Sequence, residues 1–197
     1  MKIPALPKAV PARGNAATIG LGRLALRLGG WRVEGEFPDT PKAVIIVAPH
    51  TSNWDFVWGF SIKLALGLRA SFLGKHTLFW GPAGPLLRWL GGIPVDRKVA
   101  QSVVEQTADA FRASERLYLA VAPEGTRKRV SHWKSGFYRI AVEADVPILP
   151  VSLDYRNRVI GLRPVFQTTG DYERDLPQLR ALFRSDMARE PDRYCAT

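Results

Sequence analysis

The sequence predicts a single α/β domain with a central mixed, largely parallel sheet flanked by helices. Its 197 residues suit one domain, and with 46% hydrophobic residues the chain can build a core. Short strand-like runs alternate with longer helical patterns, as in βαβ units. Two of the runs, 43–48 and 117–122, are hydrophobic at every position, which is typical of strands buried on both faces.

The alternation assigns an expected element to most of the chain. Residues 1–14 contain three prolines and predict an irregular arm. Strands are expected at 31–36, 43–48, 70–75, 93–95, 117–122, 147–155, 156–162 and 164–169. Helices are expected at 15–29, 54–68, 84–91, 99–113, 134–144 and 173–189.

The first helix, 15–29, is amphipathic and has two interpretations. Its apolar residues at helical spacing are Leu21, Leu24, Leu28 and Trp31. Arg23 and Arg27 form a neighbouring basic stripe. The helix either packs on the domain or lies in a membrane interface, where its arginines would meet lipid head groups. Both interpretations stay open at the level of the sequence.

The charge balance points to polyanionic partners. Lys and Arg number 28 against 18 for Asp and Glu, a net charge of +10. Such an excess attracts nucleic acid, an anionic membrane surface, phosphorylated substrates or an acidic carrier protein. Charge alone does not distinguish these four kinds of partner, so the choice depends on the sequence motifs.

The remaining composition argues against several classes of protein. A single cysteine, Cys195, allows no internal disulfide and no cysteine-based metal site, which fits a reducing compartment. The sequence contains no run of 18 consecutive apolar residues, so we expect no ordinary membrane-spanning helix. The first residues lack the apolar core of a secretory signal, so we expect a cytosolic location.

The first candidate for chemistry is the segment 49–55, directly after the buried strand 43–48. His50 and Asp55 would point apart on one continuous helix, because five residues turn the side chain by about 500°. They can meet if His50 lies in the loop and Asp55 in the first turn of the next helix. Pro49 favours that break, and Ser52 or Asn53 suits a helix N-cap. A carboxylate on one imidazole nitrogen leaves the other free as a general base.

Two further segments follow strand ends. In 122–129, Gly125 allows a tight turn, Arg127 is a forked cation suited to phosphate, and Glu124 can accept a hydrogen bond from a hydroxyl. In 91–97, a glycine pair and a short strand lead to Asp96 and Arg97. Each segment alone is better explained by a surface turn with solvated charges.

Several other motifs are absent from the sequence. It has no G-x-S-x-G nucleophile elbow, no Walker A sequence and no H-E-x-x-H pair. His76 and His132 show no partner pattern, so both are interpreted as structural or surface residues.

Taken in order, the segments resemble the motifs of the glycerolipid acyltransferase family, typified by 1-acylglycerol-3-phosphate acyltransferases. The four matching stretches are His50-Thr-Ser-Asn-Trp-Asp55, Gly92-Ile-Pro-Val-Asp-Arg97, Pro123-Glu-Gly-Thr-Arg127 and Val146-Pro-Ile-Leu-Pro150. The resemblance covers residues 43 to 153. It implies an acyltransferase domain over 31–197, preceded at 1–30 by the arm and the possible membrane-interface helix.

The resemblance also implies roles for individual residues. His50 would be the general base and Asp55 its orienting partner. Segment 147–150 would help to shape the acyl-chain site. The acceptor's phosphate and glycerol would be bound by Lys75, Arg97, Glu124, Gly125, Thr126 and Arg127.

The implied reaction is transfer of a fatty acyl group from acyl-CoA or acyl carrier protein, as cosubstrate, to a lysolipid hydroxyl. An activated thioester requires no metal, no other cofactor and no enzyme nucleophile. Pro49, Pro94 and Ala122 depart from residues common in the family, so a lyso-aminolipid such as a lyso-ornithine lipid stands beside 1-acylglycerol-3-phosphate as acceptor. We expect a peripheral or monotopic protein on the cytoplasmic face of the inner membrane, bound to anionic lipids. The rival from another class is a non-enzymatic basic protein that binds nucleic acid or membranes.

Overall fold

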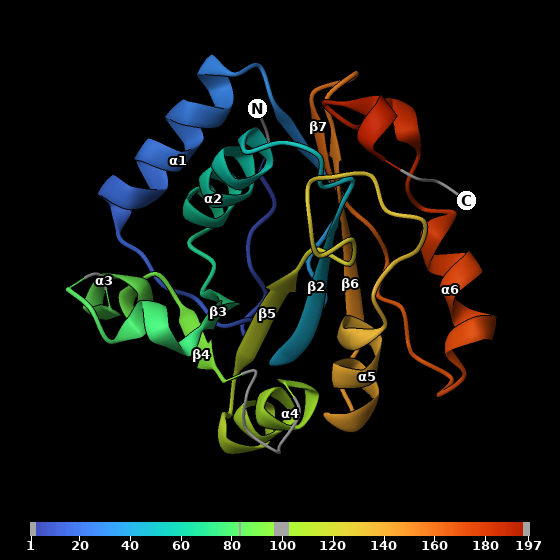
Figure 1. The fold of residues 1–197 in the computed structure, drawn as a ribbon. Coiled ribbons are helices and arrows are strands. Elements are labelled where there is room, and N and C mark those ends of the chain that lie inside the picture. The colour runs from blue at the N-terminus through green and yellow to red at the C-terminus, as the bar shows by residue number, and fades with distance from the viewer. Residues whose placement is uncertain (1–2, 83, 97–102, 195–197) are drawn as a thin grey trace.

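The computed structural model describes residues 3–82, 84–96 and 103–194 and is built around a seven-stranded sheet (Figure 1). The strand order is β1-β7-β6-β2-β5-β3-β4. All neighbouring strands run parallel except the antiparallel pair β6 and β7. The strands are β1 Arg32–Glu34, β2 Lys42–Ala48, β3 Ala70–Lys75, β4 Gly92–Val95, β5 Leu117–Val121, β6 Ile148–Asp154 and β7 Val159–Leu162. The predicted mixed, largely parallel sheet is confirmed.

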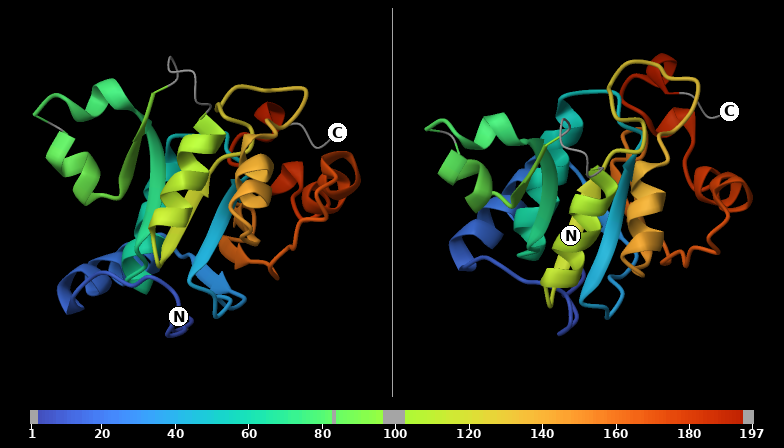
Figure 2. Two further views of the ribbon diagram at one scale, coloured as in Figure 1. Left: turned by 90° about the horizontal axis from the view of Figure 1, so that it is seen from below. Right: turned by 60° about the horizontal axis from the view of Figure 1, so that its bottom comes forward.

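Helices cover both faces of this sheet, so the molecule has three layers (Figures 1 and 2). Helices α1 and α2 lie on one face and α4, α5 and α6 on the other, while α3 flanks the edge formed by β3 and β4. The helices are α1 Ala16–Leu28, α2 Trp54–Leu66, α3 Gly84–Trp89, α4 Val103–Ala113, α5 Gly136–Glu143 and α6 Tyr172–Arg180, with single 3-10 turns at His76–Phe79, Ser185–Met187 and Pro191–Arg193.

Strand β2 shows how the sequence pattern produces the layers. Side chains alternate along a strand, so Ala43 and Ile45 point into the core under α1 and α2. Val44 and Ile46 point into the core under α4 and α5. All four are buried, which confirms the prediction that this strand has no solvent-exposed face.

Helix α1 packs on the domain, but with a different side from the one its leucines suggested. Gly22 meets α2 so closely that an added Cβ would lie 2.4 Å from the backbone nitrogen of Ala65, and Leu26 is fully buried beside it. Leu21, Leu24 and Leu28 therefore face outward and are exposed. No helix among the described residues is long and apolar enough to cross a membrane.

Three predicted elements are shorter than the sequence pattern indicated. The strand expected at 156–162 begins at Val159, after a turn. The stretch 164–169 is not a strand: only Phe166 forms a bridge, to Ile148, and Pro164 has no N–H for a ladder. The last helix ends at Arg180 instead of residue 189 and is followed by short 3-10 turns, which still bury apolar residues. Residues 99–102 of the expected fourth helix lie outside the described residues.

Candidate active site

The predicted functional segments gather at one edge of the sheet. Strands β6, β2, β5, β3 and β4 are consecutive neighbours and parallel, so their carboxyl ends lie together. His50 follows β2, Glu124 follows β5, and Lys75 is the last residue of β3. Arg97 comes two residues after β4 but lies outside the described residues, as does the side chain of Lys75. This edge is where open α/β sheets bind ligands.

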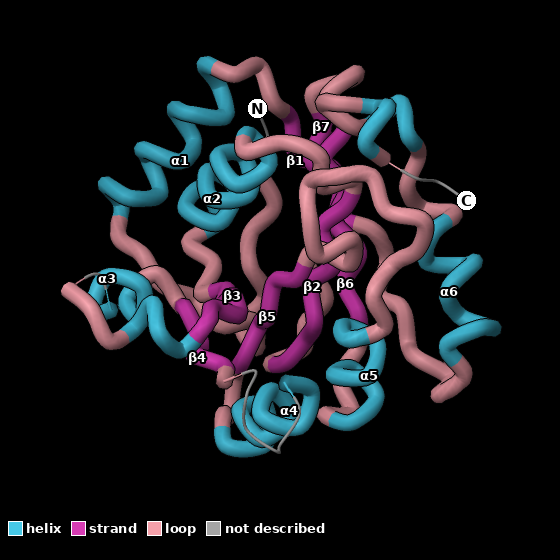
Figure 3. Tube along the Cα trace, in the orientation of Figure 1, coloured by secondary structure: helices cyan, strands magenta, loops and turns pink. Residues whose placement is uncertain are grey.

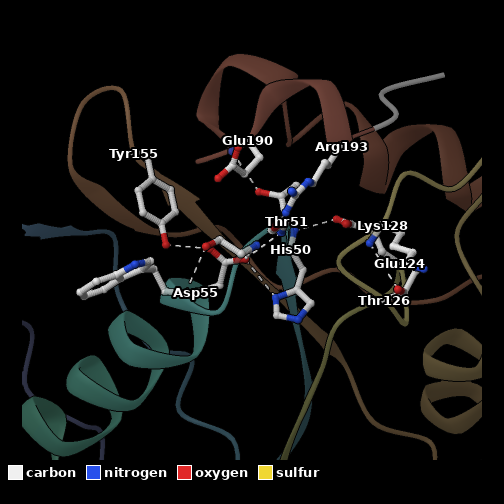
Figure 4. Close-up of polar contacts among 11 residues, drawn as sticks. His50, Thr51, Asp55, Glu124, Thr126, Lys128, Tyr155, Glu190 and Arg193 are labelled. Carbon is white, nitrogen blue, oxygen red and sulfur yellow. Dashed lines mark hydrogen bonds and ion pairs between the residues drawn. The ribbon is translucent and has the colours of Figure 1, made fainter.

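His50 and Asp55 form the predicted pair (Figure 4). The loop after β2 carries His50, and Asp55 lies in the first turn of α2, so the break between strand and helix brings them together. The distance from His50 Nδ1 to Asp55 Oδ2 is 3.2 Å, and the Asp55 side chain is 1% exposed against 22% for His50. With Nδ1 turned to the carboxylate, Nε2 is the nitrogen available to a substrate hydroxyl.

Three further groups hold the Asp55 carboxylate. The backbone N–H groups of Thr51 and Ser52 donate to Oδ2 at 2.7 and 2.8 Å, and the hydroxyl of Tyr155 donates to Oδ1 at 2.7 Å. Burial by itself would raise the pKa of Asp55. The hydrogen bonds from His50, Ser52 and Tyr155 outweigh burial and hold this pKa below its usual value, so Asp55 is a carboxylate.

Glu124 is buried beside His50, a contact that sequence analysis did not foresee. Its Oε1 accepts a hydrogen bond of 2.8 Å from the backbone N–H of His50, and the residue is 2% exposed. Burial raises the pKa of Glu124 to about 7, against the lowering effect of that hydrogen bond and with a further contribution from the charge of Asp55. Its Oε2 has no hydrogen-bond partner among the described residues.

The loop after β5 carries the basic residues. Gly125 has φ +67°, a left-handed conformation that favours glycine, and its N–H donates to the carbonyl of Ala122, so the predicted tight turn is present. Thr126 Oγ1 accepts from the N–H of Lys128 at 3.3 Å. The exposed cations of this loop and of α5 are Arg127, Lys128, Arg129, Lys134 and Arg139.

The C-terminal segment braces the loop that carries His50, and sequence analysis missed it. The N–H of Glu190 donates to Thr51 Oγ1 at 3.2 Å, and the Arg193 guanidinium donates to the Thr51 carbonyl at 3.4 Å (Figure 4). Arg189 lies 5.1 Å from the ring centre of Trp54. No motif could reveal these contacts, because the partners are at least 135 positions apart in the sequence.

An apolar cavity of about 340 Å³ extends from His50 and Asp55 between α2 and the sheet. Phe56, Gly59 and Phe60 line it from α2, and Val151 and Leu153 line it from β6. Residues 147–150, which were expected to help shape an acyl-chain site, do not line this cavity. Pro147 precedes β6 and residues 148–150 begin it, at the end of the strand away from His50.

Among the described residues that line the cavity, Lys63 is the one that carries an ammonium group. Its Nζ donates to the carbonyl of Leu90 at 2.6 Å and so joins α2 to the turn after α3. Burial lowers its pKa, and the positive charge of Arg13 adds to that effect.

His76 has a charged neighbour that no sequence pattern indicated. Its Nδ1 lies 3.3 Å from Asp96 Oδ1, directly before Arg97. The side chain of Gln106 bonds both the N–H and the carbonyl of Asp96. The end of β4 is thus tied to the turn after β3 and to α4.

Comparison with known proteins finds relatives over most of the chain. The acyltransferase family profile matches residues 31–154, more than half of the chain. The chain is 31% identical to the 1-acyl-sn-glycerol-3-phosphate acyltransferase of Haemophilus influenzae over 163 residues, covering 75% of this chain and 66% of that protein. It is 29% identical to the enzyme of that name from Escherichia coli over 193 residues, covering 92% and 77%.

A solved structure shares the fold. The crystal structure of the 1-acyl-sn-glycerophosphate (LPA) acyltransferase PlsC from Thermotoga maritima superimposes with a TM-score of 0.62 at 19% identity. The match covers 84% of this chain and 75% of that one. Together with the family profile, it leads to one conclusion: the chain belongs to the acyltransferase family.

Proposed function

We propose that this protein transfers a fatty acyl group from a thioester, acyl-CoA or acyl carrier protein, to the hydroxyl of 1-acylglycerol-3-phosphate. The observation that carries the proposal is the His50–Asp55 pair at the end of an apolar cavity. The relatives from Haemophilus influenzae and Escherichia coli are named for this acceptor, which supports the choice of substrate.

In the proposed mechanism, His50 Nε2 removes the proton of the acceptor hydroxyl as its oxygen attacks the thioester carbonyl. The tetrahedral intermediate then collapses, the C–S bond breaks, and the thiolate takes the proton back from the imidazolium. A new ester and a free thiol are the products. Asp55 stays ionised throughout and stabilises the imidazolium, because Tyr155 and two backbone N–H groups already hold its charge.

The acyl chain would occupy the apolar cavity. Its walls are aliphatic and aromatic along α2, β2, β5 and β6, and it opens beside the imidazole, where the thioester carbonyl must lie. Such a surface is suited to a hydrocarbon chain and unsuited to a charged head group. The acyl donor would therefore enter with its chain between α2 and the sheet.

The acceptor's phosphate would meet the cations at the ends of β5, β3 and β4. Arg127 is exposed on the loop after β5, and Lys75 ends the neighbouring strand. We assign phosphate binding to these two residues and to Arg97, and contact with the glycerol to Glu124, Gly125 and Thr126. An arginine guanidinium suits a phosphate because it donates two parallel hydrogen bonds.

The protein would bind to the cytoplasmic face of the inner membrane through the side of the molecule that carries α1 and α3. Helix α1 presents Leu21, Leu24 and Leu28 to solvent, next to Arg23 and Arg27. Exposed Trp80, Leu86 and Trp89 lie in α3 or just before it, and Trp89 contacts Arg13, which precedes α1. Exposed leucines beside arginines suit a helix in an interface that contains anionic lipids.

The direct test is mass spectrometry of the purified protein with acyl-CoA or acyl carrier protein and a panel of lysolipids. We expect acylated product from 1-acylglycerol-3-phosphate, and a loss of about 10²- to 10⁴-fold in kcat for His50→Ala, the usual contribution of a general base. A His50→Ala variant as fast as the wild type would refute the proposed base.

The same panel separates the alternatives. Product from a lyso-ornithine lipid, with none from 1-acylglycerol-3-phosphate, would assign the lyso-aminolipid as acceptor. No product from any acceptor, together with salt-sensitive binding to nucleic acid, would favour the non-enzymatic rival.

A further inference from the structure

Asp55 has an uneven distribution of hydrogen bonds. Its Oδ2 is approached by three donors, the N–H groups of Thr51 and Ser52 and the Nδ1 of His50. Its Oδ1 accepts from Tyr155, at 2.7 Å. The terminal torsion of an aspartate is broad, so hydrogen bonds decide how the carboxylate is turned. Tyr155 is the group that holds the second oxygen.

The structure fixes Tyr155 on three sides. It is the first residue after β6, which is the neighbour of β2, and its backbone N–H donates to the carbonyl of Met187 at 2.8 Å. The edge of its ring packs on buried Trp31 at 5.0 Å between ring centres. Arg189 lies 5.9 Å from the ring centre. The hydroxyl is therefore directed to Asp55 by packing from separate parts of the chain (Figure 4).

We propose that Tyr155 is a positioning residue for acyl transfer, whose hydroxyl holds the Asp55 carboxylate in the orientation that keeps His50 Nδ1–H bonded to Oδ2. The inference rests on the proposed function, because it assigns a role in that reaction. Without the hydroxyl, Oδ1 is a buried acceptor for which the described residues provide no other hydrogen-bond donor. The carboxylate then rotates or takes up water, and the imidazole loses its fixed orientation.

The role has a consequence for the base itself. A hydroxyl that donates to the carboxylate reduces the negative charge that His50 meets. Removing it should strengthen the attraction between the carboxylate and a protonated imidazole. Among the described residues, the titratable or charged groups around the pair include Glu124 on the loop after β5, Lys63 on α2, and Arg189, Glu190 and Arg193 on the C-terminal segment. All of them remain when Tyr155 is replaced by phenylalanine.

Tyr155→Phe keeps the ring and removes the hydroxyl. We expect kcat to fall about tenfold or more, since hydrogen bonds to charged groups are among the stronger ones, with KM for both substrates within about twofold. The acid limb of the pH profile of kcat/KM should move to higher pH by about half a unit or more. In an Asp55→Ala background, Tyr155→Phe should have no further effect on kcat.

The matched control is Tyr172→Phe. Tyr172 is also partly buried and donates one hydrogen bond, to the carbonyl of Trp133 at 3.2 Å on the opposite face of the sheet. It should leave kcat and the pH profile unchanged. A Tyr155→Phe variant with kcat within twofold of the wild type and an unmoved profile overturns the inference.

An NMR titration of the His50 ring separates this inference from the proposed reaction. The chain has three histidines, so the His50 signals are assigned by their loss in His50→Ala. A raised midpoint for His50 in Tyr155→Phe supports the inference even if the wild type acylates none of the lysolipids. An unchanged midpoint and tautomer overturn it even if acyl transfer is observed.

Discussion

The two faces of the sheet are covered to different degrees. Under α4, α5 and α6 the packing is closed, and Phe111, Phe137, Ile140 and Leu179 are each at most 2% exposed. Under α2 a cavity of about 340 Å³ remains, with His50 and Asp55 at its end. The same strands contribute alternate residues to both sides.

This difference shows how one sheet can serve stability and binding together. Close packing gives the larger contribution per residue to the free energy of folding, because every methylene of a closed core is in contact. An open cavity gives up part of that contribution and gains a place for an apolar ligand. Substitutions on the two faces should therefore change different properties of the protein.

The largest expected effect on stability is on the closed face. Phe137→Ala should lower the free energy of unfolding by about 3–5 kcal/mol, because it leaves a cavity beside Trp133. Phe56→Ala, on the cavity side and 62% exposed, should lower it by less than about 1 kcal/mol. Urea unfolding of both variants measures the difference, and equal losses would contradict the comparison.

The next largest effect on stability is expected from Glu124, which lies at the carboxyl edge of the sheet. Its pKa is about 7 in the folded protein and near 4.5 when unfolded, so the folded state binds the proton more tightly. The stability that this gives is present below pH 4.5 and is lost as the pH rises through 7. From pH 5 to pH 8, the free energy of unfolding of Glu124→Gln should therefore increase relative to that of the wild type by on the order of 3 kcal/mol.

Urea unfolding at several pH values tests the Glu124 prediction. The matched control is Glu36→Gln, an exposed glutamate between β1 and β2. Its difference from the wild type should not depend on pH. A Glu124→Gln variant that behaves like this control would show that Glu124 is ionised at neutral pH without cost.

The pairing of His50 with Asp55 could be predicted from the sequence because the decisive signals are local. Pro49 breaks the strand, Asp55 falls in the first helical turn, and five residues separate the partners. Tyr155 could not be predicted in the same way. Its place beside Asp55 depends on β6 being the neighbour of β2, and a single sequence does not give strand order.

Helix α1 shows a second limit of sequence reasoning. The helical spacing of Leu21, Leu24 and Leu28 does place them on one side of the helix, but that side faces solvent. Gly22 decides the packing, because only a residue without a side chain allows α1 to approach α2 so closely. Close helix contacts through glycine leave almost no hydrophobic signal in the sequence.

The cavity itself gives a prediction with a small effect on stability. Gly59 lines it from α2, and a Cβ added there meets no atom within 4 Å. Gly59→Leu should therefore place its side chain in the cavity and change the free energy of unfolding by less than about 1 kcal/mol. We expect kcat/KM for long-chain acyl donors to fall about tenfold or more relative to short-chain donors, because the new side chain occupies space that a long chain needs.

Acyl-donor competition assays measure this selectivity. Gly20→Leu is the matched control, because Gly20 also has open space around its Cβ position but lies on the exposed side of α1. Unchanged chain-length preference in Gly59→Leu, with normal activity, would place the acyl chain elsewhere.

The smallest effect on stability is expected on the outer surface of α1. Leu24→Asp should change the free energy of unfolding by less than about 0.5 kcal/mol, because Leu24 is 52% exposed. It should nevertheless weaken binding to vesicles of phosphatidylethanolamine and phosphatidylglycerol about tenfold or more, since a leucine that enters the interface buries its apolar area there. Val142→Asp, on the exposed side of α5 over the opposite face of the sheet, introduces the same charge and should bind as the wild type does. If vesicle flotation finds both variants equally weakened, general repulsion by the added negative charge explains the loss, and α1 is not the membrane contact.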